Sequence, residues 1–381
     1  MEHIEWLEDT CQVRYAGQTI ALLPKEYALL RHLYTWKNRT FTREQLLDSV
    51  WAMETPTDRT VDDHIYRLRR KLAKWSHLFT IETVRGVGYR LNGKIMHAPQ
   101  PQALNQSFAD HVRGMLETYH GMGMGAAMHT LASHQDVLGI RLDPYYEFYL
   151  PFIRGDFFWF LHDQAFPMPE KCFYLLHIYY MIETDTTSCA SLFANNIQPY
   201  LSQMRAIYRD ELQIATIGIY TQTGDWERAR AALQEARKIV EPLQSTGFTL
   251  YLHAQEALLD LMSDRLDAAE AITDQALEIL KSIPMQRELG TFTLLRGFCQ
   301  YRRQQKAAAR IAVDQAIEVT RSTQFIPHLI HAVRKLLFFY RHFGCDPEWE
   351  RKYEGVWREL SEEYHFASLR KEIHAQLSKL R

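Results

Sequence analysis

The sequence predicts a protein of more than one domain: an α+β domain with winged helix-turn-helix order, followed by an all-α, right-handed solenoid of helical repeats. Strand and helix patterns alternate over the first 92 residues, a segment rich in proline and glutamine follows, and helical periodicity with a 40-residue repeat dominates the remainder. We therefore expect a first domain over residues 1–92, a linker over 93–107 and a helical-repeat domain over 108–381.

The first domain contains local signals for each of its elements. Pro24 suits the first turn of a helix, Thr42 and Gln45 form a capping-box pattern, and two glycines at positions 86 and 88 mark a hairpin turn. In chain order, we expect strands over 4–6 and 12–22 around a turn at 16–17, a helix over 25–34, a short strand at Phe41, a helix from Thr42 through 51, a helix over 59–74, and a hairpin of strands 79–83 and 89–91.

The helix over 59–74 has one apolar face and one basic face. Its apolar stripe recurs at spacings of four, three and four residues, at Val61, Ile65, Leu68 and Leu72. The opposite face carries Arg59, Asp63, Tyr66, Arg67, Arg70 and Lys74. Residues 59–90 contain eight Lys or Arg against three Asp or Glu, a net charge of +5. Such a face suits the major groove of DNA, although charge alone equally fits a helix face that is only solvated.

The second domain is predicted from a repeat of small residues. At a shift of 40 residues, three sets coincide: Ala229, Ala269 and Ala309; Ala236, Ala276 and Ala316; and Ile239, Ile279 and Val319. The expected helical pairs are 204–220 with 226–240, 249–262 with 266–280, 289–301 with 306–320, and 328–342 with 348–362. Small residues at fixed positions let each pair pack closely on the next. The alternative is a set of unrelated amphipathic helices.

The first helices of such pairs form a concave surface that binds peptides or partner helices. Polar or aromatic residues on these otherwise apolar helices are the candidates for its lining, with ordinary surface or packing positions as the alternative. They are Tyr208, Arg209, Gln213, Tyr251, Gln255, Arg296, Gln300, His331 and Arg334.

Composition narrows the functional classes. The chain of 381 residues has 44 Lys and Arg against 46 Asp and Glu, so any surface for a nucleic acid must be local. The five cysteines include no C-x-x-C pair, which fits reduced thiols, and neither a signal peptide nor a membrane helix is evident. The glycine-rich segment 121–125 lacks the strand and the Lys-Ser/Thr of a phosphate-binding loop. We therefore expect a cytoplasmic protein without catalytic residues, metal or cofactor.

Four segments of the first 92 residues resemble the OmpR/PhoB-type winged-helix DNA-binding domain. They are Leu23-Pro24-Lys25-Glu26-Tyr27; Thr42-Arg43-Glu44-Gln45-Leu46-Leu47 with Val50-Trp51; Arg59-Thr60-Val61-Asp62, His64-Ile65 and Arg67-Leu68-Arg69-Arg70-Lys71-Leu72; and Thr83-Val84-Arg85-Gly86-Val87-Gly88-Tyr89-Arg90-Leu91. The resemblance covers a quarter of the chain, and its several parts make it specific.

The resemblance implies roles for individual side chains. Arg59, Thr60 and His64 would contact phosphates. Arg67 and Arg69 would be the groove-facing or backbone-facing arginines of the recognition helix, and Arg85 on the wing would reach the adjacent minor groove. Tyr66 departs from many relatives, which carry another basic or small polar residue there, so no base preference is carried over. The full set of expected DNA contacts is Arg59, Thr60, His64, Tyr66, Arg67, Arg69, Arg70, Lys74, Thr83 and Arg85.

The layout as a whole resembles one-component transcriptional regulators that carry tetratricopeptide-like repeats, although the period of 40 exceeds the usual period of about 34. The resemblance implies a homodimer that binds double-stranded DNA and senses a peptide, small ligand or protein in the solenoid groove, with RNA polymerase as a further partner. The alternative is an adaptor in which both the repeats and the winged helix bind proteins.

Overall fold

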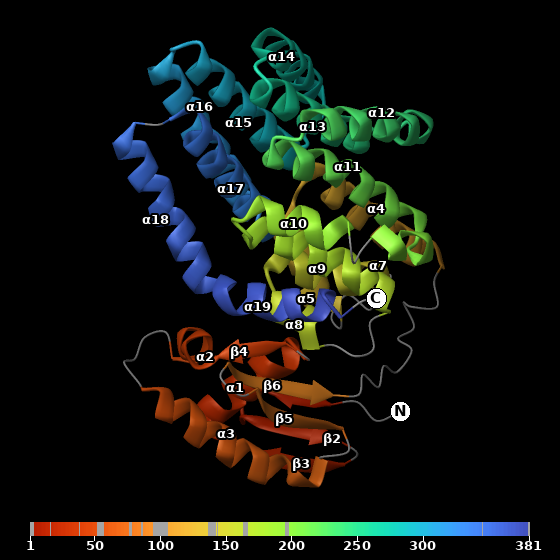
Figure 1. Ribbon diagram of the computed structural model, residues 1–381. Coiled ribbons are helices and arrows are strands. Elements are labelled where there is room, and N and C mark those ends of the chain that lie inside the picture. The colour runs from red at the N-terminus through yellow and green to blue at the C-terminus, as the bar shows by residue number, and fades with distance from the viewer. Residues whose placement is uncertain are drawn as a thin grey trace. The chain divides into compact units, whose positions relative to one another are not determined.

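The computed structural model describes residues 4–15, 17–37, 39–51, 57–75, 78–84, 87–93, 106–135, 142, 144–162, 167–194, 198–344 and 346–379. These residues form two compact units. The first contains the described residues up to Arg113 and those between Thr130 and Leu142, and the second contains Gly114–His129 and the described residues from 144 onward. The chain begins with a small α+β winged-helix fold and continues as a large all-helical region, as the sequence predicts (Figure 1). The domain limits at 92 and 108 stay a prediction.

The winged-helix fold is built on two antiparallel sheets of three strands, in the orders β1-β2-β3 and β4-β6-β5. In the second sheet Phe41 lies opposite Tyr89, and Ile81 lies opposite Leu91. The elements are β1 (Glu5–Leu7), β2 (Gln12–Tyr15), β3 (Gln18–Ala21), α1 (Pro24–Thr35), β4 (Thr40–Thr42), α2 (Arg43–Val50), α3 (Asp58–Leu72), a 3-10 turn (Ala73–Trp75), β5 (Phe79–Val84) and β6 (Gly88–Gly93).

Side-chain caps start the first two helices where the sequence predicts them. The Thr42 hydroxyl accepts a hydrogen bond from the Gln45 amide at 3.1 Å, and the Gln45 side chain accepts one from the Thr42 amide at 3.0 Å. At α1, Pro24 occupies the first turn and the Glu26 carboxylate accepts a hydrogen bond from the Leu23 amide at 2.9 Å. Both capping interactions satisfy amides that have no partner inside the helix.

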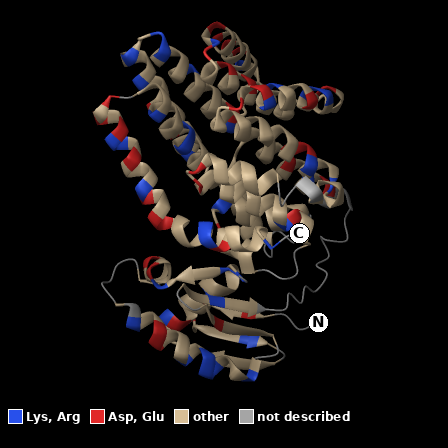
Figure 2. Ribbon diagram, viewed as in Figure 1, with Lys and Arg blue, Asp and Glu red and all other residues tan. Residues whose placement is uncertain are grey.

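The apolar stripe of α3 anchors that helix in the core of the winged-helix fold. Val61, Ile65, Leu68 and Leu72 are buried in one hydrophobic cluster with residues of α1 and the sheets. The stripe faces inward because residues spaced by three and four positions share one side of a helix. The opposite side of α3 is therefore exposed, and it carries several of the Lys and Arg residues of this fold (Figure 2).

The remainder of the described chain is helical. Its elements are α4 (Gln106–Met122), α5 (Gly125–Ser133), α7 (Pro144–Arg154), α8 (Phe157–His162), α9 (Met168–Ile182), α10 (Thr186–Leu192), a 3-10 turn (Gln198–Gln203), α11 (Ala206–Thr223), α12 (Trp226–Leu243), α13 (Thr246–Met262), α14 (Leu266–Ser282), α15 (Gln286–Arg302), α16 (Lys306–Ser322), α17 (Ile326–Phe343), α18 (Pro347–Glu363) and α19 (Phe366–Leu377). As expected, the glycine-rich segment separates two helices, α4 and α5. No helix of the described residues is long and apolar enough to span a membrane.

The helices from α11 to α18 follow the predicted pairs. The repeated alanines at 229, 269 and 309 and at 236, 276 and 316 are all buried, as close packing of the paired helices requires. The backbone takes positive φ, between 45° and 79°, at intervals of half the repeat, except between 264 and 304, which are one full repeat apart. These turn positions are Gly224, Gln244, Asp264, Gln304, Gln324 and Gly344. The handedness of the array and its tetratricopeptide character stay predictions.

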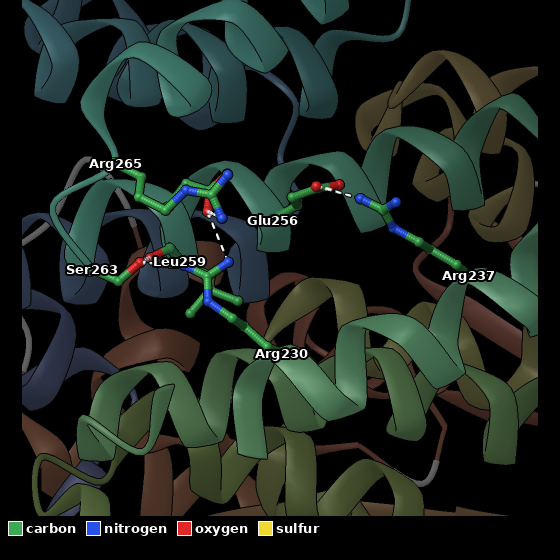
Figure 3. A network of polar contacts seen from close by, with 7 residues as sticks. Arg230, Arg237, Glu256, Leu259, Ser263 and Arg265 are labelled. Atoms are coloured by element: carbon green, nitrogen blue, oxygen red, sulfur yellow. Dashed lines mark hydrogen bonds and ion pairs between the residues drawn. The ribbon is translucent and has the colours of Figure 1, made fainter. Parts of the chain in front are cut away.

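Polar contacts join the first repeat pair to the second. Arg230 of α12 contacts buried Asp260 of α13 at 3.3 Å and donates to the Ser263 hydroxyl at 2.9 Å (Figure 3). Arg265 also approaches Asp260, at 3.6 Å. A second ion pair joins Arg237 to Glu256. A buried carboxylate is stable only when it is paired, so these contacts fix how the two pairs stack.

Candidate nucleic-acid interface

The outer face of α3 and the turn after it presents the predicted basic surface. Arg59, Tyr66, Arg67, Arg70 and Lys74 are exposed, and Tyr66 leaves 62% of its surface accessible although it is aromatic. The Arg70 guanidinium lies 5.9 Å from the Tyr66 ring centre. A large exposed aromatic side chain among cations is unusual on a surface that contacts only water.

Several cations of this face are not used inside the fold. Arg59, Arg67 and Lys74 form neither an ion pair nor a hydrogen bond with any residue in the described ranges. Asp63, on the same face, is exposed and forms no ion pair with a described residue either. Because no internal acceptor in the described part of the chain uses their N–H donors or compensates their charge, the side chains of Arg59, Arg67 and Lys74 are available to phosphate oxygens.

Other basic residues of α3 hold the fold together. Arg69 Nε donates to the Ile81 carbonyl at 2.9 Å and Arg69 Nη2 donates to the Thr83 hydroxyl at 2.8 Å, so this arginine joins α3 to β5. Lys71 Nζ donates to Glu26 at 2.6 Å and to the Ala21 carbonyl at 3.2 Å. Arg69 and Thr83, both expected at the DNA, are therefore engaged with each other.

An acidic group of α3 is neutralised from the neighbouring elements. Asp62 accepts hydrogen bonds from Arg43 Nε at 2.8 Å and from the Tyr89 hydroxyl at 2.6 Å. Although burial alone would raise the pKa of Asp62, these bonds from Tyr89 and Arg43 hold it below its ordinary value. The sequence did not predict this network. In the charge balance of residues 59–90, Asp62 was counted only as one of the acids that lower the net charge.

Two further residues predicted to contact DNA, Thr60 and His64, lie near the beginning of α3. His64 Nδ1 lies 2.8 Å from the Thr60 carbonyl, and the His64 ring packs edge-on against Trp51 at 5.1 Å. Thr60 and His64 are both half-buried, so each presents only part of its surface. The predicted wing contact Arg85 lies outside the described residues.

The candidates for the solenoid groove occupy three environments. Tyr208, Gln255 and Arg334 are buried, which corrects the expectation that they line an open surface. Tyr208, for example, packs on Phe173 and accepts a hydrogen bond from Arg205 at 2.7 Å. Arg296 is exposed and pairs with Asp274 of α14 at 3.0 Å. The half-buried candidates are Arg209, Gln213, Tyr251, Gln300 and His331.

A cavity of about 510 Å³ lies beside α11 and α12. Gln213 is the predicted groove residue that lines it, together with Thr216, Tyr220 and Arg228. The repeat pattern predicts a groove lined by the first helices of the pairs, whereas this cavity is also lined by α12, the second helix of its pair.

Comparison with known proteins places the winged-helix fold in a family. Residues 17–91 match the family described as "Transcriptional regulatory protein, C terminal". The N-terminal domain therefore belongs to this OmpR/PhoB-type winged-helix family.

Curated relatives match over the same part of the chain. The heme response regulator HssR of Staphylococcus aureus (strain bovine RF122 / ET3-1) is 41% identical over 85 residues, which are 22% of this chain and 38% of that protein. The transcriptional regulatory protein SrrA of Staphylococcus aureus (strain NCTC 8325 / PS 47) is 44% identical over 101 residues, 26% of this chain and 42% of that protein. The chain thus spans about two fifths of the length of the curated relatives it matches.

Two solved structures are also similar to this part of the chain. The DNA-binding domain of the response regulator AdeR, crystallised with an intercistronic region, is 32% identical, with a TM-score of 0.22 and coverage of 25% of this chain and 97% of that one. The DNA-binding domain of Bacillus subtilis CssR is 36% identical, with a TM-score of 0.21 and coverage of 23% and 99%.

Proposed function

We propose that this chain is a transcriptional regulator whose winged-helix domain binds double-stranded DNA through the exposed face of α3. The observation that carries the proposal is the set of outward cations, Arg59, Arg67 and Lys74, that form no internal pair within the described residues. The family of the domain and the names of the relatives support the same role.

Arg67 and Arg70 are the side chains we assign to the major groove, with Tyr66 beside Arg70 on the same face. Arg59, Thr60, His64 and Lys74 would hold the phosphates on either side, and Arg85 would reach the minor groove from the wing. We give Arg69 and Thr83 an indirect role, because their mutual hydrogen bond holds β5 against α3.

We further propose that the helical region forms a homodimer and senses a peptide, small ligand or protein. Antiparallel helical pairs that stack through buried alanines are suited to both tasks, because they build extended surfaces. A ligand that prefers one curvature of the array would shift the spacing of the two winged helices and so the occupancy of paired half-sites. A regulator of this kind needs no catalytic activity. It would act in the cytoplasm, where the chromosome lies, and RNA polymerase would be a further partner.

Selection from a random pool of duplexes tests the proposal. We expect the full chain to enrich one motif, repeated at a spacing of about one helical turn, 10–10.5 base pairs, or a multiple of it. Arg67→Ala should lose the enrichment, whereas Lys281→Ala, on the exposed surface of α14, should keep it. Failure of the full chain to enrich any duplex sequence would contradict the proposal and favour an adaptor role.

A further inference from the structure

Polar side chains from four helices of the helical unit lie close enough to interact electrostatically. We name His177 of α9, Glu211 of α11, Arg287 of α15 and His328, His331 and Lys335 of α17 the inner polar cluster. All six side chains are half-buried, so they are neither sealed in the core nor freely solvated.

Helix α17 contributes three nitrogen-bearing side chains to the cluster, and they form a stripe along the helix. His328, His331 and Lys335 follow one another at spacings of three and four residues, which places them on one face of the helix. No hydrogen-bond partner is present for the buried atoms His328 Nδ1 and His331 Nε2. The Lys335 ammonium forms neither a hydrogen bond nor an ion pair within the described part of the chain. Such groups are costly to leave without a partner.

Helix α9 packs against this stripe, and Arg334 of α17 adds a further donor without a partner. The His331 ring meets the Tyr180 ring of α9 at 5.3 Å, and the Arg334 guanidinium lies 4.7 Å from the same ring centre. Arg334 is only 5% exposed; its Nε donates to the Glu183 carbonyl at 3.0 Å, but its Nη1 has no partner. A buried guanidinium nitrogen without an acceptor in the chain can donate to a partner from outside it.

Helices α15 and α11 contribute Arg287 and Glu211 to the cluster. Arg287 donates to the Tyr149 hydroxyl at 3.3 Å and to the His120 carbonyl at 2.9 Å, while its Nε has no partner. Glu211 lies 3.8 Å from His177 Nε2. Desolvation acts on the whole group: it raises the pKa of Glu211 to about 7 and lowers that of Lys335 to about 8.

Positive charge therefore exceeds negative charge in this poorly hydrated region. Glu288 lies 3.6 Å from Arg287, and Glu211, which also interacts with Arg287, is only partly ionised at neutral pH. Arg334 and Lys335 form no ion pair with a carboxylate among the described residues. Burial also holds the pKa values of His328 and His331 well below the ordinary value, so both imidazoles are neutral hydrogen-bonding groups there. Excess desolvated cations and neutral imidazoles are the chemistry that binds an oxyanion.

We propose that the inner polar cluster, together with the adjoining Arg334, binds a small organic molecule through an oxyanion, a carboxylate or a phosphate, with Lys335, Arg334 and His331 as the principal contacts. The binding site itself follows from the helical unit alone. Its use as the sensory site of a regulator rests on the function proposed above.

Isothermal titration calorimetry on the full chain tests the site, with inorganic phosphate and citrate as the two probes and chloride at equal ionic strength as the reference. Lys335→Met removes an unpartnered charge and leaves no new one, so the variant should fold, which circular dichroism verifies. Wild-type protein should bind one of the probes saturably, and Lys335→Met should weaken binding about tenfold or more. Binding of phosphate alone would identify a phosphate ligand, and binding of citrate alone would identify a carboxylate.

Two controls separate this site from the DNA-binding face. Lys281→Met, on an exposed surface, and Arg67→Ala, on α3, should both keep the wild-type affinity for the anion. Absence of saturable binding, equal binding by Lys335→Met, or loss of binding in Arg67→Ala would overturn the proposal. Anion binding at Lys335 in a chain that binds no duplex would preserve the site and overturn only its regulatory use.

Discussion

Two arginines of α3, separated by a single residue, serve different purposes. Arg67 is exposed and has no partner among the described residues, whereas Arg69 donates two hydrogen bonds, to the backbone and side chain of β5. Their positions on the helix do not distinguish them. A long arginine side chain can reach a neighbouring strand, and the sequence does not show which strand lies beside the helix. This is why the sequence predicted both as DNA contacts.

Alanine substitution should separate these two roles. We expect Arg67→Ala to lower duplex affinity about tenfold with an unchanged melting temperature. Arg69→Ala should cost about 1–2 kcal/mol of stability, because it removes two hydrogen bonds. Fluorescence anisotropy with a labelled duplex and thermal unfolding of each full-length variant measure both quantities. An equal loss of stability in Arg67→Ala would assign that residue to the fold.

Glu26 makes the stability of the winged-helix fold depend on pH. Its carboxylate is 1% exposed, and although burial alone would raise its pKa, the bonds from Leu23 and Lys71 hold that pKa below the ordinary 4.5. A carboxylate with a lowered folded-state pKa contributes stability above pH 4.5, and this contribution is lost as the pH falls through the folded-state pKa.

Glu26→Gln measures that contribution. We expect the variant to be less stable than the wild type by about 2 kcal/mol at pH 7 and the difference to shrink as the pH falls below 4.5. Urea unfolding of both full-length proteins between pH 7 and pH 3 gives the comparison. A difference that stays constant over this range would show that Glu26 stabilises by packing rather than by charge.

At the scale of elements, the closest packing in the repeats lies between α15 and α16. A Cβ atom at Gly297 of α15 would lie 2.8 Å from Val313 Cγ2 and 3.3 Å from the carbonyl oxygen of Ala309. Ala309 is one of the alanines whose recurrence predicted the repeat. The facing glycine was not predicted, because Gly297 has no counterpart in the other three pairs, where Ile217, Ala257 and Leu337 occupy the same position.

Gly297→Ala should therefore destabilise the helical region. Overpacking costs about 1–3 kcal/mol and outweighs the gain of up to about 1 kcal/mol in helix propensity. The matched control is Gly355→Ala in α18, where no atom lies within 4 Å of the added Cβ, and we expect this variant to be slightly stabilised. Thermal unfolding of the two variants should shift in opposite directions; equal shifts would contradict the packing described for α15 and α16.

At the scale of the whole molecule, features formed by residues close in the sequence were predictable. Sites formed by side chains from several distant helices were not. The capping box at Thr42 and the apolar stripe of α3 involve residues within one or two turns, so the sequence predicts them. The inner polar cluster joins His177 to Lys335 through the stacking of several helices, and no sequence period places these residues together. Among its members the sequence singled out only His331 as a candidate for the solenoid groove.

The net charge of the chain, −2, means that DNA binding must come from a local surface. The central claim is that the exposed face of α3 provides it. The most direct measurement is the dependence of duplex affinity on salt for the full chain and for Arg59→Ala, Arg67→Ala and Lys281→Ala. We predict a steep wild-type decrease, with a slope of log affinity against log salt that becomes shallower by about 1 for each α3 variant and stays unchanged for Lys281→Ala. Affinity that does not vary with salt, or one slope shared by all four proteins, would contradict the claim.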